Sequence, residues 1–392
     1  MRIKSCTIYA LGIPFVEAFA HSARRREHSD SIVVRVEAAD GTAGYGEGVA
    51  RRYVTGETVE TSINHIRKVL WPVVARRDYE ELAPEADPLD ALAPLCESLP
   101  YEGGEGVAAF NAARCAMELA LLDCLLRRRE MSLADLLPPR RTSVTYGGVI
   151  SSGSTEGTIR RARQLKLFGM SEIKIKIKSK DDASRVRVVR EVFGESARLR
   201  VDANGAFETR EAIEVAEELA PLNLAAFEQP VARTSGISVM REVRERSSIP
   251  VMADESLVTE RDARELIDAG ACDYFNLRVS KCGGVAQTLR LARLAEASGL
   301  RLQLGSQVGE TAILSAAGRH LAAHLDTVEF VEGSYGKLLL VEDVGRDPLQ
   351  FGHGGRAPTL RGVGLGVQVR EEVLEKYALR KIRLGEGEKN HA

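Results

Sequence analysis

The chain has 392 residues, of which 44% are hydrophobic and 28% are charged, so it can bury a large core and is not a disordered protein. Its 54 basic and 56 acidic residues nearly cancel, and this balance argues against a nucleic acid or a membrane surface as its partner. Its six cysteines form no CxxC pair, and no segment is apolar enough for a signal peptide or a transmembrane helix, so we expect a cytoplasmic enzyme with reduced thiols.

The first part of the chain predicts a mixed α+β domain. Residues 31–48 contain an apolar run, an Asp-Gly turn and a second short strand, which is the pattern of a β-hairpin. Over residues 106–128, apolar side chains recur at helical spacing and the run ends in basic residues. Pro138 and Pro139 cannot continue a helix, so we expect the first domain to cover residues 1–138.

From residue 139 onward, short apolar runs alternate with amphipathic helical segments. Strands that alternate with helices predict parallel βαβ units, and eight of them predict a closed (β/α)8 barrel of the TIM type, which we expect to extend to residue 355. The alternative is an open doubly wound sheet, but the first run is not followed by the GxGxxG pattern that such a fold needs. The eight runs begin at residues 143, 172, 198, 224, 249, 274, 301 and 327.

Three carboxylates end consecutive predicted strands at equal intervals. Asp202, Glu228 and Asp254 are spaced 26 residues apart, so one βα unit separates each pair and all three should meet at the C-terminal mouth of the barrel. Converging carboxylates repel one another unless a cation lies between them, and ligands that are all oxygen favour Mg²⁺ or Mn²⁺ over Zn²⁺. Any one of the three could, by itself, be a helix cap or part of a turn.

A lysine precedes this series at the same spacing. Lys176 lies 26 residues before Asp202, and Lys174 and Lys178 share its side of the predicted strand. A divalent cation and two further lysines disfavour the ammonium form of Lys176, which suits it to act as a general base. The alternative is an exposed edge strand whose lysines oppose aggregation, but a closed barrel has no edge strands. A register slip of two residues would make Lys178 the base instead.

Further polar residues follow the sixth and seventh predicted strands. Arg278 ends the sixth strand and Lys281 lies in the loop after it, so both could face the substrate from the side opposite Lys176. Gln307 and Glu310 follow the seventh strand, within range of a hydrogen-bonding or acid role. Glu310 could equally cap the helix that comes next.

Taken together, these motifs resemble those of the enolase superfamily and, within it, of the mandelate racemase/muconate-lactonizing-enzyme subgroup. The resemblance extends over nearly the whole chain, and the ordered set is highly specific although each motif alone is weak. The matching stretches are KIK at 174–176, VDANGAF at 201–207, FEQP at 227–230, ADES at 253–256 and SKCGG at 280–284, with GYGEG at 44–48 and GLGV at 364–367 near the two ends.

The resemblance implies a modified barrel with a capping domain that the segment 356–392 completes. It also implies that Asp202, Glu228 and Asp254 hold Mg²⁺. In this scheme Lys176, with Lys174 beside it, abstracts a proton α to the carboxylate of a small-molecule substrate. A base combined with magnesium is the general arrangement of enolase-superfamily sites. We also expect the chain to form a homo-oligomer.

One departure from the family pattern affects the expected reaction. Many members carry a lysine where this chain has Arg278, and a guanidinium is a poor proton shuttle but a good oriented cation. A racemase needs an acid or a base on both faces of its substrate, so we expect elimination (a dehydratase or other lyase) or cycloisomerisation, with Lys176 acting on one face. Two alternatives stay open: an amino-acid or dipeptide epimerase that uses Lys176 and Lys281, and a metal-binding scaffold without activity.

Substrate contacts are expected from the barrel mouth and from two loops of the capping domain. In relatives, segments such as residues 16–30 and 50–58 close over the mouth and exclude water. The residues that we expect to contact the substrate are Asn204, Glu255, Gln307, Lys178, His21, Arg24, Arg51 and Tyr53.

Overall fold

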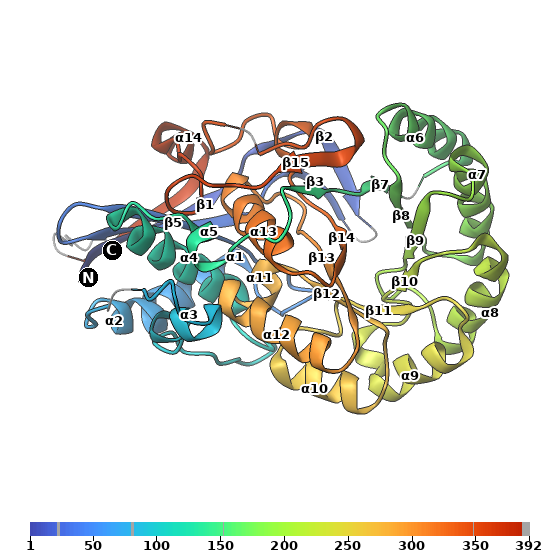
Figure 1. Cartoon of the computed structure of the whole chain (residues 1–392), viewed down its shortest axis with the longest axis horizontal. Coiled ribbons are helices and arrows are strands. Elements are labelled where there is room, and N and C mark those ends of the chain that lie inside the picture. The colour runs from blue at the N-terminus through green and yellow to red at the C-terminus, as the bar shows by residue number, and fades with distance from the viewer. Residues whose placement is uncertain (22–23, 80–81, 152, 348, 386–392) are drawn as a thin grey trace.

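The computed structural model describes residues 1–21, 24–79, 82–151, 153–347 and 349–385, without the side chains of residues 17–26 and 337. It consists of a mixed α+β cap and an eight-stranded barrel that lie side by side (Figure 1). None of the helices in these segments combines the length and the apolar character that a bilayer-spanning helix needs.

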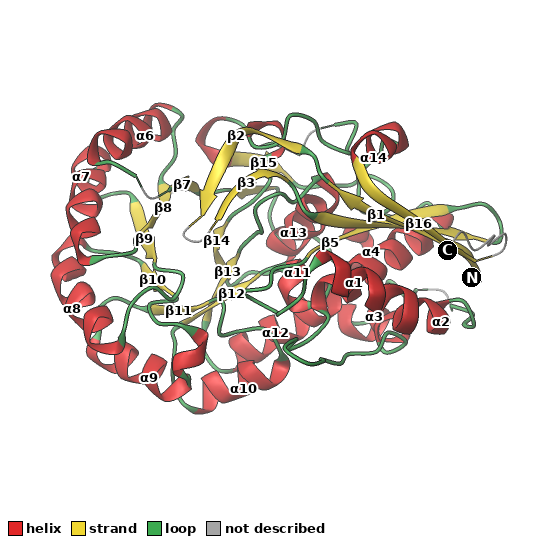
Figure 2. Ribbon diagram, turned by 180° about the vertical axis from the view of Figure 1, so that it is seen from behind, coloured by secondary structure: helices red, strands yellow, loops and turns green. Residues whose placement is uncertain are grey.

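The cap is built on an antiparallel sheet. Its strand order is β16 (Ala378–Gly385), β1 (Ile3–Leu11), β4 (Ser31–Ala38) and β5 (Ala43–Val49). The predicted hairpin is confirmed, because β4 and β5 are direct neighbours with Ser31 paired to Val49. The strand β16, which ends at Gly385, pairs with β1 near the N-terminus, so segments far apart in the sequence are neighbours in this sheet (Figure 2). A separate ribbon is formed by β2 (Pro14–His21) and β3 (Arg24–His28).

Helix α4 (Asn111–Arg128) packs on the cap sheet, mainly on β5. It confirms the predicted helix, although it begins five residues later than the start of the 106–128 run. The cap also contains shorter helices: α1 (Val59–His65), the π-helical η1 (Ile66–Leu70), α2 (Trp71–Val74), α3 (Pro88–Cys96), α5 (Leu133–Leu136) and α14 (Glu371–Tyr377).

Three glycines of β5 let α4 approach the sheet closely. Gly44, Gly46 and Gly48 occupy alternate positions of the strand, so all three face the same side. A Cβ atom on Gly46 would lie 2.1 Å from the carbonyl oxygen of Ala116, and one on Gly48 would lie 2.0 Å from that of Ala112. The GYGEG stretch is therefore required for packing, because any side chain at these positions would meet the helix backbone.

The eight predicted apolar runs each supply one strand of a single parallel sheet, which confirms the predicted barrel (Figure 2). The sheet curls so that its two ends meet, and the Gly147 N–H donates to the Val331 carbonyl oxygen at 2.9 Å. Its strands, in spatial order, are β7 (Gly148–Ile150), β8 (Glu172–Lys176), β9 (Arg198–Asp202), β10 (Ala226–Glu228), β11 (Val251–Ala253), β12 (Tyr274–Leu277), β13 (Arg301–Leu304) and β14 (Val328–Val331).

The first predicted run divides into two strands. Only its second half is β7 of the barrel, whereas its first half is β6 (Ser143–Thr145), which pairs with β15 (Arg356–Pro358) in a separate small sheet. The remaining helices are α6 (Thr155–Leu167), α7 (Ala183–Phe193), α8 (Thr209–Leu219), α9 (Ile237–Arg246), α10 (Glu260–Asp268), α12 (Val285–Ala297) and α13 (Ala312–His324), and the first five follow the outer rim of the barrel in Figure 1. Single turns complete the described part: η2 (Lys180–Asp182), η3 (Ala220–Leu222), η4 (Arg233–Ser235), α11 (Val279–Cys282), η5 (Gly336–Leu338) and η6 (His353–Gly355).

Buried carboxylates of the cap bind the N-termini of barrel helices. Glu47 of β5 accepts hydrogen bonds from the backbone N–H groups of Thr311 at 2.9 Å and Leu314 at 3.1 Å, at the start of α13. Glu118 of α4 accepts one from Ala286 at 3.1 Å, at the start of α12. The first N–H groups of a helix have no partner within the helix, and the helix dipole favours a negative charge beside them. The cap is therefore attached directly to the helices that follow β12 and β13.

Substitution of Gly46 by alanine tests the close packing of α4 on β5. The added methyl group would overlap the helix backbone, and we expect a loss of about 3 kcal/mol in the free energy of unfolding. Urea unfolding followed by circular dichroism measures this change. Gly153→Ala is the matched control, because Gly153 is exposed and a Cβ atom there would meet nothing within 4 Å. Equal stability of the two variants would contradict the packing role.

Candidate active site

Strand register brings the predicted base and the predicted ligands into one row. Lys176 is paired with Asp202, and Asp202 is paired with Glu228 on the next strand. Asp254 directly follows β11, the neighbour of β10. The four side chains therefore lie at the C-terminal ends of four adjacent strands, β8 to β11, as their equal spacing in the sequence predicted.

Lys174 is the buried cation at the centre of this row. Its Nζ lies 2.9 Å from Asp202 Oδ2 and 3.0 Å from Glu228 Oε1. It also lies 3.3 Å from the carboxylate of Glu332, which follows β14. Burial alone would lower the pKa of Lys174, but these three carboxylates raise it well above its usual value. Lys174 is therefore a permanent positive charge rather than a base.

Lys176 is the more open of the two lysines. Its side chain is 15% exposed, against 3% for Lys174. Its Nζ donates a hydrogen bond to Asn204 Oδ1 at 2.8 Å and lies 3.5 Å from Asp202 Oδ2. Lys178 lies beyond the end of β8 with an exposed side chain, and its backbone N–H donates to Asp182 at 2.7 Å. The structure thus brings Lys176, and not Lys178, to the carboxylates.

The opposite side of the site is formed by β12. In the sheet, β12 is four strands away from β8, so Arg278 and Lys176 face each other across the barrel mouth. The guanidinium of Arg278 is paired with Asp254 and lies 3.7 Å from Glu228 Oε1. These carboxylates raise the pKa of Arg278 well above its usual value although burial opposes the shift. A guanidinium held in this way stays charged and cannot take up a proton.

Lys281 is buried and its ammonium group is fully bound. Its Nζ lies 3.0 Å from Asp254 Oδ1 and donates to the carbonyl oxygens of Asp254 and Asn276, each at 2.7 Å. An ammonium group has three protons, and all three have acceptors here. Lys281 therefore supports Asp254 from behind. The sequence alone did not reveal this, because the acceptors belong to two different strand ends.

The carboxylates themselves differ in their surroundings. Burial raises the pKa of Asp202, but Lys174 and Lys176 reverse this effect and hold the pKa below its usual range. Burial likewise raises the pKa of Glu228, and here it outweighs the effect of Lys174. Glu228 accepts hydrogen bonds from Asn276 Nδ2 at 2.9 Å and from Gln303 Nε2 at 3.2 Å. The neighbouring amides thus help to hold this buried carboxylate in place.

Sequence reasoning did not identify Asn276, Gln303 and Glu332 as part of the site. Asn276 and Gln303 lie within the buried strands β12 and β13, and Glu332 directly follows β14. Asn276 lies two positions before Arg278, so the period of two along a strand places both on the inner side of the barrel. A polar residue at an inward position of a predicted barrel strand is therefore the signal that could have identified them.

The donor chemistry of the three carboxylates suits a hard divalent cation. Within the described residues, no three His, Cys, Asp or Glu side chains converge closely enough to hold a metal ion, because cations lie between the carboxylates. Lys174 bridges Asp202 and Glu228, whereas Arg278 bridges Glu228 and Asp254. The buried Oδ2 of Asp202 lies 2.9 Å from Lys174 Nζ and 3.5 Å from Lys176 Nζ, so lysines hold this oxygen in the structure. A donor set made only of carboxylate oxygens nevertheless fits Mg²⁺ in its chemistry.

The two lid residues that the structure describes in full have different surroundings. Arg51 is 2% exposed and donates to Asp30 Oδ1 at 2.6 Å, to the Ala50 carbonyl oxygen at 2.9 Å and to the Val308 carbonyl oxygen. It therefore joins the loop at residues 50–58 to the segment after β13. It was expected to contact the substrate, but its guanidinium is already bound by the protein.

Tyr53 is the second of these two lid residues. Its side chain is half exposed, and it lies close enough to Arg278 to contribute to the raised pKa of that guanidinium. The other two expected lid contacts, the side chains of His21 and Arg24, lie outside the described residues.

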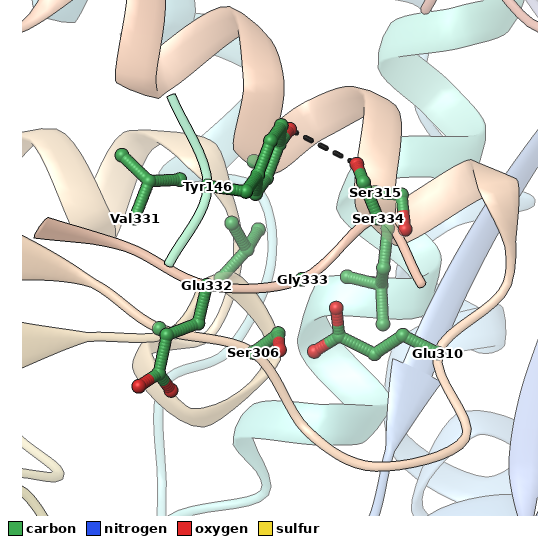
Figure 3. A pocket seen from close by; sticks show the side chains of 12 residues that line it. Tyr146, Ser306, Glu310, Ser315, Val331, Glu332, Gly333 and Ser334 are labelled. Atoms are coloured by element: carbon green, nitrogen blue, oxygen red, sulfur yellow. Dashed lines mark hydrogen bonds between the residues drawn. The ribbon is translucent and has the colours of Figure 1, made fainter. Parts of the chain in front are cut away.

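Glu310 lies in the turn after β13, and of the two roles that the sequence suggested the structure excludes the helix cap, because Thr311 caps α13. Its Oε1 accepts a hydrogen bond from the Gln307 backbone N–H at 2.6 Å, so it closes the turn after β13 and does not cap α13. Its carboxylate lines a cavity of about 10 Å³ together with Ser306 and Glu332, and this cavity is bounded by α13 (Figure 3). Burial raises the pKa of Glu310 to about 8. It is a half-buried acid in the turn that joins β13 to α13.

Asn204 and Glu255 interact with each other beside the base. Asn204 Nδ2 donates to Glu255 Oε1 at 3.1 Å, while Asn204 Oδ1 accepts the hydrogen bond from Lys176. Burial and the neighbouring Asp254 raise the pKa of Glu255 to about 8. The two residues were expected to contact the substrate, which stays a prediction, and the structure connects them to Lys176. Gln307 is buried at the mouth, and its Oε1 accepts no hydrogen bond from any described residue.

Comparison with known proteins gives matches over nearly the whole chain. Residues 10–138 match the family described as "Mandelate racemase / muconate lactonizing enzyme, N-terminal domain", and residues 157–373 match "Enolase C-terminal domain-like". An N-succinyl-L-Arg/Lys racemase of Bacillus cereus is 28% identical over 97% of this chain and 98% of its own length. Muconate cycloisomerase 1 of Pseudomonas putida is 29% identical over 89% of this chain and 90% of its own.

One of the similar crystal structures contains a metal ion. The crystal structure of a dipeptide epimerase from Cytophaga hutchinsonii, complexed with Mg and the dipeptide D-Ala-L-Val, is similar with a TM-score of 0.84 and 27% identity. The similarity covers 98% of this chain and 100% of that chain. The named relatives are enzymes, which argues against the alternative of a scaffold without activity.

Replacement of Arg51 by alanine tests its role in the lid. The change removes buried hydrogen bonds made by a charged group, and we expect a loss of about 3 kcal/mol in the free energy of unfolding. Arg52→Ala is the matched control, since Arg52 is the next residue and is exposed, and we expect it to change stability by less than about 0.5 kcal/mol. Urea unfolding of both variants measures the difference. If Arg51→Ala were as stable as Arg52→Ala, Arg51 would be free to bind substrate.

Proposed function

The chain belongs to the mandelate racemase/muconate lactonizing enzyme family of the enolase superfamily, and from this premise we propose that it abstracts the proton α to a substrate carboxylate with Lys176. The observation that carries this proposal is the placement of Lys176. It is the lysine of the row that is accessible, and it lies beside the carboxylate cluster across the mouth from Arg278. A small carboxylic acid bound between the two would present one face to Lys176.

We assign Mg²⁺ to Asp202, Glu228 and Asp254. When bound, the ion supplies a Lewis acid for the substrate carboxylate and for the negative charge of the enolate. The support for this assignment is the oxygen-only donor set and the Mg found in the dipeptide epimerase that this chain resembles.

The two lysines of β8 have separate roles in this proposal. Lys174 is held as an ammonium by Asp202, Glu228 and Glu332, so it supplies a fixed positive charge beside the site rather than a free donor to the substrate. Lys176 in its neutral form takes the α-proton, and it can return that proton to the product or to a leaving group on the same face. Negative charge that develops on the substrate is then stabilised by positively charged groups that are already in place. Such preorganised stabilisation is the main electrostatic requirement of this chemistry.

Proton transfer on a single face is the form that this site supports best. On the opposite face, Arg278 stays charged and the ammonium of Lys281 is bound by three acceptors. Neither side chain is arranged to accept a second proton. Arg278 is placed instead to bind an anionic group of the substrate. We therefore propose elimination or cycloisomerisation, and a muconate cycloisomerase is among the similar enzymes.

Epimerisation is the second candidate, and the similar enzymes favour it. They include an N-succinyl-L-Arg/Lys racemase and several dipeptide epimerases. This reaction would require Lys281 to leave Asp254 and Asn276 and to turn toward the substrate. The cytoplasmic location and the homo-oligomeric state stay predictions.

Removal of the proposed base should abolish proton exchange. We expect Lys176→Ala to lower the rate of α-proton exchange in D₂O by at least about 100-fold, because a positioned base contributes at least that factor. A screen of sugar acids, hydroxyproline-like acids and dipeptides, followed by NMR, measures the exchange. Lys178→Ala is the matched control and should keep its activity. Full activity of Lys176→Ala would exclude Lys176 as the base.

The products of the same screen separate the two candidate reactions. Elimination converts the substrate to a keto acid, whereas cycloisomerisation gives an isomer with a new ring. Epimerisation returns deuterated substrate with inverted configuration, and this result would require an acid or base on the face of Arg278.

Removal of one proposed ligand should weaken metal binding. We expect Asp202→Asn to lower the affinity for Mg²⁺ by at least about 100-fold, because the amide removes a charge from the donor set. Isothermal titration calorimetry measures the affinity. Asp268→Asn, at an exposed position near the end of α10, makes the same change outside the site and should bind Mg²⁺ as the unmodified protein does. Unchanged affinity of Asp202→Asn would remove Asp202 from the ligand set.

A further inference from the structure

A chain of two hydrogen bonds leads from the base across the barrel mouth. Lys176 Nζ donates to Asn204 Oδ1 at 2.8 Å, and Asn204 Nδ2 donates to Glu255 Oε1 at 3.1 Å. The three residues come from the ends of β8, β9 and β11. The base is therefore connected to a strand end that lies three strands away.

The backbone of Asn204 is held in place independently of its side chain. Its φ of 47° lies in the left-handed region, which asparagine tolerates better than most residues. Its backbone N–H donates to Asp202 Oδ1 at 2.9 Å. With the backbone held, the remaining freedom of Asn204 is the rotation of its side chain.

Glu255 removes that remaining freedom. An amide has an accepting oxygen on one side and a donating nitrogen on the other, and the Lys176 ammonium can only donate. Only one orientation of Asn204 therefore places an acceptor at Lys176. Glu255 Oε1 accepts the amide N–H in that orientation, and it can do so whether or not the carboxyl group is protonated. Glu255 thus selects the orientation that binds the base.

The stability of the fold does not explain why a buried glutamate is present at position 255. Its side chain is buried, with 6% exposed, and its Oε2 accepts no hydrogen bond from any described residue. A buried carboxyl group with an unsatisfied oxygen costs stability. Its position between Asn204 and the charged Arg278 is better explained by a contribution to the site.

We propose that Glu255 is a positioning residue for the base and that it acts on Lys176 through the amide of Asn204. This inference rests on the proposed role of Lys176. Lysine has a flexible four-carbon side chain, so its amine must be held if it is to meet an α-proton at reactive distance. The hydrogen bond to Asn204 holds one N–H of the neutral amine and leaves its lone pair to the substrate.

Two substitutions of Glu255 test whether this residue positions Lys176 or contacts the substrate. Glu255→Gln keeps an oxygen that accepts from Asn204, whereas Glu255→Met keeps the length of the side chain without an acceptor. We expect Glu255→Met to lower kcat by about 10–100-fold with KM changed by less than about threefold, because a small misplacement of a catalytic group has this effect. Glu255→Gln should restore kcat to within about threefold of the unmodified enzyme. The substrate is the acid that exchanges fastest in the screen described above.

Crystal structures of the two variants with Mg²⁺ give a readout that needs no substrate. In Glu255→Met, the Asn204 amide should rotate and the Lys176 amine should leave its position near Asp202. In Glu255→Gln both groups should stay in place. An unchanged hydrogen bond between Lys176 and Asn204 in Glu255→Met would overturn the proposal.

Asn204→Ala gives an independent test if Glu255→Met folds poorly. Because both residues act through one chain, the double variant Asn204→Ala/Glu255→Met should be no slower than Asn204→Ala alone. If the fold losses in kcat of the two single variants multiplied in the double variant, the proposal would be overturned. A Glu255→Gln variant as slow as Glu255→Met would overturn it as well. A rise in KM with unchanged kcat would show instead that Glu255 contacts the substrate.

The outcome for Lys176→Ala distinguishes this inference from the proposed function. If Lys176→Ala keeps its activity, the assignment of the base fails and the positioning role fails with it. If Lys176→Ala is inactive but Glu255→Met keeps its full kcat, only the positioning role is overturned.

Discussion

The structure of the site depends on how buried carboxylates are neutralised at the end of the barrel. Parallel strands place Asp202, Glu228 and Asp254 side by side, and an isolated buried charge is too costly to persist. Lys174 and Arg278 meet this requirement, because each lies between two of the carboxylates. Arg278 is also the residue that we place against an anionic group of the substrate, so charge balance in the fold and recognition in the reaction share this side chain.

The cap contributes to this arrangement through buried polar contacts with the barrel. Asn111, at the start of α4, donates to the carbonyl oxygens of Val258 and Lys281, which lie in the loops after β11 and β12. Glu47 and Glu118 bind the first turns of α13 and α12. The loops that carry the site are thus held from both sides. This explains how Arg278 and Lys281 can keep fixed orientations at the start of and within the single helical turn α11.

Prediction from the sequence succeeded where the signal is periodic. The interval of 26 residues between Lys176, Asp202, Glu228 and Asp254 corresponds to one βα unit, and parallel register converts it into proximity. It did not indicate the protein contacts of Arg51 and Lys281, because the identity of a buried partner is not local. Arg51 binds the carbonyl group of Val308, and nothing in the sequence near residue 51 indicates that contact.

The sequence by itself determined the family, the barrel and the row of carboxylates beside a lysine. The reason is that the alternation of strands with helices and the equal spacing of the polar residues can be counted directly in the sequence. Only the tertiary structure decided which lysine and arginine side chains of the site are already bound by the protein and which can act on a substrate. It bound Lys281 to three acceptors, placed Glu310 in the turn after β13 and connected Glu255 to Lys176 through Asn204. The physical reason is that the state of a buried polar group depends on all of its neighbours, and in a barrel these neighbours come from strands far apart in the chain.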